Sequence, residues 1–106
     1  MYVNVDVSES PAVALRDEDD FGSFKVVVRG MAEGDSRLAE VLEPYGSIAA
    51  DGHALLRIDA VKDLAAARGQ DAEWLAQLDG MIGYARSRGW LAEDGSAIQA
   101  HCEYPA

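Results

Sequence analysis

Three consecutive residues near the end of the chain, His101, Cys102 and Glu103, carry side chains that are used in metal binding and nucleophilic chemistry. Apolar and polar residues alternate around them, which predicts a strand whose successive side chains point to opposite faces. Cys102 is therefore badly placed to pair with His101 in a thiolate–imidazole dyad, and we expect it to be a small buried hydrophobe. His101 and Glu103 share the opposite face of this strand, where they are candidates for a common site.

A metal centre needs a third and usually a fourth protein ligand, and His53 is the only other histidine in the chain. No spacing of these residues matches a metal-binding motif, so we expect neither a metal nor a cofactor. The acidic run at residues 17–20 does not continue as a calcium-binding loop, and we interpret it as a solvated loop. There is no phosphate-binding glycine loop and no serine nucleophile elbow. The sequence leaves open whether the protein is an enzyme, and the lack of a catalytic motif favours a protein without catalytic activity.

Tyr84 is a further candidate, because it falls toward the polar side of a predicted long helix. Gly80 and Gly83 in the same helix each cost about 1 kcal/mol relative to alanine. Such glycines indicate the close approach of another group, which is either the sheet, a second protomer, or a ligand in a pocket beside Tyr84. The candidate ligand-binding residues are Tyr84, His101, Glu103 and His53.

The longest helix is predicted near residues 71–88. Its apolar residues recur at the spacing of one helical face, namely Trp74, Leu75, Leu78, Met81, Ile82 and Ala85. Asp71 suits the N-cap position, and Gly89 suits a left-handed stop. We expect Trp74 and Trp90 to bury their rings at the two ends of this helix.

A hairpin is predicted after the helix, with Asp94 and Gly95 as a type I′ turn that sets Leu91 opposite Ile98. Strands are also predicted at residues 2–7, 12–16, 24–29, 47–50 and 53–57, the last two joined by a second Asp-Gly turn. The alternative for residues 53–57 is the beginning of a helix that runs to residue 68. Two shorter helices are predicted to start near Asp35 or Ser36 and near Asp59.

These elements predict a single α+β domain over residues 1–106, built in two layers. In it, a mainly antiparallel sheet of about four to five short strands packs against three helices. The order of elements in residues 35–104 also matches a winged helix-turn-helix, whose long helix would enter the major groove of DNA. That alternative is disfavoured because the polar face of the helix offers Glu73, Gln77 and Asp79, with arginines only at its end.

The formal net charge of −10 argues against nucleic acid and anionic membranes as partners. With one cysteine, no secretory signal and no apolar run that could span a bilayer, we expect a cytoplasmic location. The preference for alanine and arginine is typical of a GC-rich bacterial coding sequence.

From these features we expect an accessory or regulatory module that acts through protein contacts. Self-association as a homodimer is one such contact. The alternatives are a small-molecule-binding protein or small enzyme with a pocket between the long helix and the sheet, and a winged-helix transcription regulator.

Overall fold

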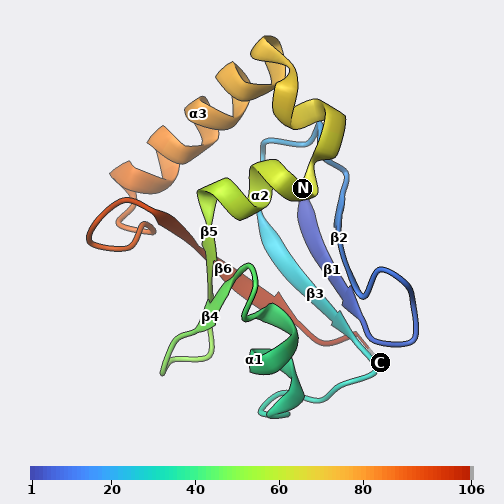
Figure 1. Ribbon diagram of the computed structural model, residues 1–106. Coiled ribbons are helices and arrows are strands. Elements are labelled where there is room, and N and C mark those ends of the chain that lie inside the picture. The colour runs from blue at the N-terminus through green and yellow to red at the C-terminus, as the bar shows by residue number, and fades with distance from the viewer. Residues whose placement is uncertain (106) are drawn as a thin grey trace.

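Six strands form one curved, mixed sheet in the order β2-β1-β3-β6-β5-β4 (Figure 1). The structure is a computed structural model that describes residues 1–105 of the chain. The strands are β1 (Tyr2–Asp6), β2 (Val13–Arg16), β3 (Lys25–Arg29), β4 (Gly46–Ile48), β5 (Ala54–Arg57) and β6 (Ala97–Glu103). The helices are α1 (Arg37–Leu42), α2 (Ile58–Leu64) and α3 (Ala72–Ser87), and the 3-10 turn η1 (Ala66–Gln70) lies between the last two.

The prediction of one α+β domain with three helices is confirmed, but the sheet differs from the predicted one. It has six strands instead of four or five, and β3 pairs in parallel with both β1 and β6. The other three pairings are antiparallel. This difference arises because β6 returns to the middle of the sheet after all three helices, and local sequence patterns carry no information about such distant pairing.

The position of β6 also rules out the winged-helix arrangement for residues 35–104. Instead of forming the outer strand of a wing, β6 lies between β3 and β5. The strand that was predicted to pair with β6 in a hairpin does not form, and a single β-bridge between Leu91 and Ile98 takes its place. The predicted register of the hairpin is therefore correct, although no second strand forms.

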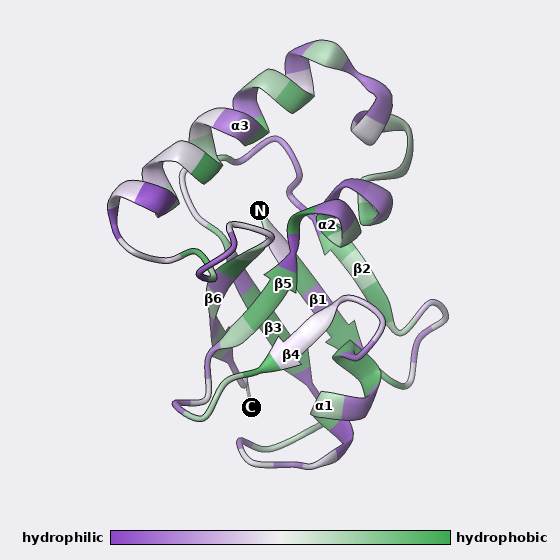
Figure 2. Cartoon of the chain, turned by 60° about the vertical axis from the view of Figure 1, so that its left-hand side comes forward, coloured by the Kyte–Doolittle hydropathy of each residue, from purple (hydrophilic) through white to green (hydrophobic). Residues whose placement is uncertain are grey.

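The core lies between the sheet and the helices. Alternate residues of the strands face it, among them Val3, Val5, Val26, Val28, Leu56, Ile98, Ala100 and Cys102. The helices contribute buried residues to the same cluster, and α3 does so through Trp74, Leu78, Ile82 and Ala85. The alternating colours along α3 in Figure 2 reflect its amphipathic sequence. Cys102 is buried in this core as expected.

The long helix begins and ends where the sequence predicts. The Asp71 carboxylate accepts hydrogen bonds from the backbone N–H groups of Glu73, at 2.9 Å, and Trp74, at 3.3 Å. Gly89 follows the helix with a left-handed φ of +77°, and the N–H of Trp90 then donates to the carbonyl oxygen of Ala85 at 2.9 Å. These contacts satisfy groups at both helix ends that have no partner within the helix.

Two predicted local details are wrong. Gly95 has a positive φ of 75°, but Asp94 does not, so the turn is not of type I′. The loop instead resembles a type I turn followed by a left-handed residue, which spares Asp94 a strained conformation. The N-cap of α2 lies two residues earlier than expected, at Arg57 and not at Asp59. Residues 54–57 form a strand, as predicted, and not the beginning of a helix.

None of the helices within residues 1–105 has the length and apolar character that a membrane span requires.

Candidate functional site

Three exposed side chains contact one another beyond the last turn of α3. The rings of Tyr84 and Trp90 meet edge to face, with centroids 5.8 Å apart and an interplanar angle of 72°. The guanidinium carbon of Arg88 lies 5.5 Å from the centroid of the Trp90 ring. Tyr84 is 60% exposed and Trp90 is 40% exposed. We call these three residues the aromatic cluster.

The local sequence explains how the aromatic cluster forms. Tyr84 precedes the buried residue Ala85 and therefore points away from the core. The left-handed turn at Gly89 brings the chain back, so that Trp90 folds onto the end of the helix. The prediction that Trp90 buries its ring is thus wrong, whereas Trp74, at the opposite end of α3, is buried as expected.

Two adjoining pockets lie next to the aromatic cluster. The smaller, with a volume of about 80 Å³, lies between α3, the loop before β3 and the start of β6, and Tyr84 and Met81 are among its lining residues. The larger has a volume of about 220 Å³ and is lined by Phe24, His53, Trp90, Gln99 and His101. Phe24, Trp90 and Gln99 line both pockets, so the two lie side by side, and we refer to them together as the depression beside Trp90.

The two histidines of the chain come together in the larger pocket. Their ring centroids are 5.9 Å apart, with an interplanar angle of 58°. They are neighbours because Ala54 of β5 pairs with Ala100 of β6, which sets the adjacent residues His53 and His101 opposite each other. Oδ2 of Asp51 lies 3.2 Å from Nδ1 of His53. The backbone N–H of His53 also donates to Asp51 at 2.9 Å, and this hydrogen bond is the main reason that the pKa of Asp51 is lowered.

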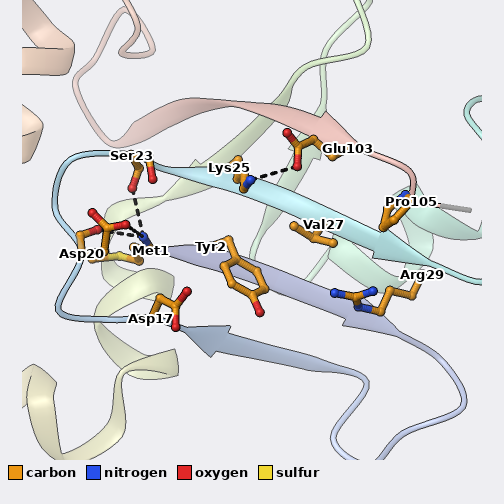
Figure 3. Close-up of a pocket in the computed structure, with 10 residues that line it drawn as sticks. All are labelled: Met1, Tyr2, Asp17, Asp20, Ser23, Lys25, Val27, Arg29, Glu103 and Pro105. Atoms are coloured by element: carbon orange, nitrogen blue, oxygen red, sulfur yellow. Dashed lines mark hydrogen bonds and ion pairs between the residues drawn. The ribbon is translucent and has the colours of Figure 1, made fainter.

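Glu103 does not join these residues. It pairs with Lys25 of the neighbouring strand, with 2.9 Å between Nζ and Oε1, and lines a separate pocket on the outer face of the sheet (Figure 3). Of the four residues expected to bind a ligand, the structure therefore gathers His53, His101 and Tyr84 around Trp90 and leaves Glu103 apart. Phe24 and Gln99 also line the larger pocket. No motif marks Phe24 as a site residue, whereas the alternation along residues 97–103 assigns Gln99 to the same face as His101.

The glycines of α3 do not pack against the sheet. A Cβ atom at Gly80 or Gly83 would meet nothing within 4 Å, and both residues are exposed. They lie on the solvent side of α3 with two other small exposed residues, Ala76 and Ser87. Of the explanations considered for the two glycines, the close approach of the sheet is therefore wrong.

The acidic loop at residues 17–20 is held to the rest of the fold through several contacts. Arg68 of η1 forms an ion pair with Asp19, and the indole N–H of Trp74 donates to the carbonyl oxygen of Glu18 at 2.8 Å. The backbone nitrogen of Met1 donates to the carbonyl oxygen of Asp20 at 2.7 Å. Within residues 1–105, no three histidine, cysteine or acidic side chains are grouped in a way that could hold a metal ion.

Comparison with protein-family models, with curated proteins and with solved structures finds no match for this chain. Its site is therefore interpreted from its own geometry.

Proposed function

We propose that this protein is an accessory or regulatory module without catalytic activity, which binds a protein partner through the outer side of α3. The observation that carries this proposal is the aromatic cluster of Tyr84, Arg88 and Trp90. Tryptophan, tyrosine and arginine are the residue types that contribute most to binding energy in protein interfaces. Here they are contiguous, partly exposed and next to a depression that can accept a partner's side chain.

The small residues on the solvent side of α3 support the same surface. Ala76, Gly80, Gly83 and Ser87 leave that side of the helix without large side chains. The distance between two packed helices depends on the side chains at their contact, so this side favours the close approach of another helix. Such an approach would also account for two glycines that each weaken the free helix by about 1 kcal/mol.

We propose that the partner is a second copy of the chain. A two-fold symmetric contact brings the same surface of both copies together, and it would set two α3 helices antiparallel across the axis. Glu73 lies in the first turn of α3, while Arg86 lies in its last turn and Arg88 caps its end. An antiparallel arrangement therefore places the acidic end of each helix beside the basic end of the other, which is a complementary pairing of charges.

Sedimentation velocity from about 10 µM to 1 mM tests this proposal. We expect a reversible dimer whose dissociation constant rises at least about tenfold in Trp90→Ala, because truncation of an interface anchor typically costs more than 1.4 kcal/mol. Gly83→Leu is a second test, since a Cβ at this exposed position meets nothing within 4 Å in the monomer, whereas a leucine side chain would hold two helices apart. Val7→Ala is the matched control, because Val7 is also exposed and lies outside this surface.

The outcome that contradicts self-association is a monomer at about 1 mM. A dimer that Trp90→Ala and Gly83→Leu leave unchanged would instead show that another surface is used. Far-ultraviolet circular dichroism of each variant separates a lost interface from a lost fold.

A second candidate function is the binding of a small molecule in the depression beside Trp90. The observation that favours it is the convergence of His53 and His101 in a pocket of about 220 Å³. Imidazole C–H resonances that shift with a panel of small aromatic and carboxylate compounds would support it. The double variant His53→Ala/His101→Ala should weaken binding of the same compounds, followed through the indole resonance of Trp90, which lines the same pocket, without changing the sedimentation of the protein.

A further inference from the structure

The outer face of the sheet, opposite the core, has a pocket of about 360 Å³ over β1 and β3. Its lining residues are Met1, Tyr2, Asp17, Asp20, Ser23, Lys25, Val27, Arg29, Glu103 and Pro105 (Figure 3). This volume lies in the range of pockets that bind small molecules. The pocket does not involve α3, so a ligand in it would be independent of the protein contact proposed for that helix.

Arg29 lies at one end of this pocket and is held in place by a buried side chain. Its Nε donates a hydrogen bond of 3.1 Å to Oδ1 of Asn4, and Asn4 is only 6% exposed. Within residues 1–105, no carboxylate oxygen lies within 4.0 Å of the Arg29 guanidinium. Asp6, which pairs with Arg29 across the strands, directs Oδ1 to the N–H and hydroxyl of Ser8 at 3.0 and 2.6 Å. The guanidinium is therefore oriented, and among the described residues it has no ion-pair partner within 4.0 Å. The pKa of Asp6 is lowered mainly by its hydrogen bonds to Ser8, and the Arg29 charge lowers it least.

Asp17 lies toward the other end, and Tyr2 lies between Asp17 and Arg29 in Figure 3. Among residues 1–105, no cationic nitrogen approaches the Asp17 carboxylate within 4.0 Å. The other charged groups of the pocket do have partners. The Met1 ammonium lies 3.9 Å from Oδ2 of Asp20 and donates to the carbonyl oxygens of Asp20 and Ser23. Lys25 is paired with Glu103, and Asp20 accepts from the N–H of Gly22 at 3.0 Å. Among residues 1–105, the pocket thus has one positive and one negative charge without an ion-pair partner, at separate places.

The chemistry of these two charges defines a class of ligand. A guanidinium binds a carboxylate through two parallel hydrogen bonds, and the Asp17 carboxylate is suited to an ammonium group. A dianion such as phosphate would leave the Asp17 carboxylate without a partner, and the three acidic side chains of the pocket balance its three cationic groups, which are Lys25, Arg29 and the Met1 ammonium. Between the ends, the Tyr2 ring and the edge of Val27, which is only 6% exposed, line the pocket.

The separation of the two charges sets the length of the ligand. The Arg29 guanidinium reaches the level of Asn4 along β1, and Asp17 follows Arg16, which pairs with Tyr2. Along the strand direction the interval is two to three residues, or roughly 7–10 Å, and the lateral offset of β2 from β1 adds to this distance. An extended tripeptide spans about 10 Å. We propose that this pocket binds a short zwitterionic peptide of about three residues, with its carboxylate on Arg29 and its ammonium group at Asp17.

Titration of the ¹⁵N-labelled full chain with trialanine, followed by NMR, tests the proposal. We expect shifts at Tyr2, Asp17, Val27 and Arg29, with a dissociation constant of about 1 mM or lower. N-acetyl-trialanine and trialanine amide each lack one terminal charge and should bind at least about tenfold more weakly. Arg29→Gln should weaken trialanine binding by the same factor and should no longer discriminate against the amide.

Asp17→Asn is the complementary variant, which should lose discrimination against the acetylated peptide. Arg16→Gln is the control, because Arg16 is a neighbouring arginine that already pairs with Glu9 and does not line the pocket. The proposal is overturned if trialanine at about 20 mM causes no shifts in these residues, or if the two blocked peptides bind as well as trialanine. Tighter binding of inorganic phosphate than of trialanine would also overturn it, by showing a simple anion site.

Discussion

The indole N–H of Trp74 donates a hydrogen bond of 2.8 Å to the backbone carbonyl oxygen of Glu18, a residue 56 positions earlier in the chain. The Trp74 ring is only 1% exposed, and Phe21 packs against it with ring centroids 5.8 Å apart. This contact fastens the first turn of α3 to the acidic loop before β3. One buried side chain thereby fixes the position of the long helix relative to the N-terminal strands.

Trp74→Phe should lower the free energy of unfolding by about 2 kcal/mol. The substitution removes a donor and leaves a partly buried carbonyl oxygen unsatisfied, in addition to some lost packing. Urea unfolding monitored by circular dichroism measures the change. Trp90→Phe is the control and should stay within about 0.5 kcal/mol of the wild type, because Trp90 is a surface residue. Equal effects of the two substitutions would contradict this account of Trp74.

Gly80→Ala should stabilise the monomer by about 0.5–1 kcal/mol. Alanine is the better helix former, and its Cβ would meet no neighbour within 4 Å. Thermal unfolding at low protein concentration, where any dimer is dissociated, measures the effect. The control is Gly89→Ala, which should destabilise the protein, because Gly89 has a left-handed φ of +77° that alanine adopts only with strain. A lower melting temperature for Gly80→Ala would reveal a close contact within the monomer.

Asp35 should titrate with a midpoint near 2. The side chain of Arg37 donates to both carboxylate oxygens, and it lowers the pKa of Asp35 from 3.8 to about 2. Because the folded-state pKa is the lower one, the stabilising effect is fully present above pH 3.8 and is lost as the pH falls toward 2. ¹³C NMR of the carboxyl group measures the midpoint. Arg37→Gln should raise it, and Arg86→Gln, a remote arginine variant, should not.

Cys102 should react slowly with a disulfide reagent such as DTNB in the native protein. Its side chain is buried, and this burial raises the pKa of the thiol, so that little of the reactive thiolate is present. We expect the native rate at pH 8 to be at least about 100-fold below the rate in denaturing urea, since reaction requires local opening. A native rate close to the unfolded rate would show that the thiol is accessible.

Several features of the protein could be predicted from the sequence because they depend on neighbours along the chain. The extent of α3 follows from its apolar spacing, the Asp71 cap and the Gly89 stop, all within about one turn of where they act. The alternation in β6 likewise predicted that Cys102 would face the core, with His101 and Glu103 on the opposite side. Periodicity determines which face a side chain takes, because the geometry of a strand is the same in every fold.

Only the tertiary structure decided which side chains lie next to His101 and Glu103 on the outer face of β6. His101 lies beside His53, and Glu103 lies beside Lys25, because β6 inserts between β5 and β3. Each neighbour is distant in the sequence, and β6 acquires it through strand pairing that is stabilised by the whole core. The same reason applies to Arg29, whose orientation depends on Asn4 of another strand. Local patterns therefore determined the elements and their faces, while long-range packing determined the pockets.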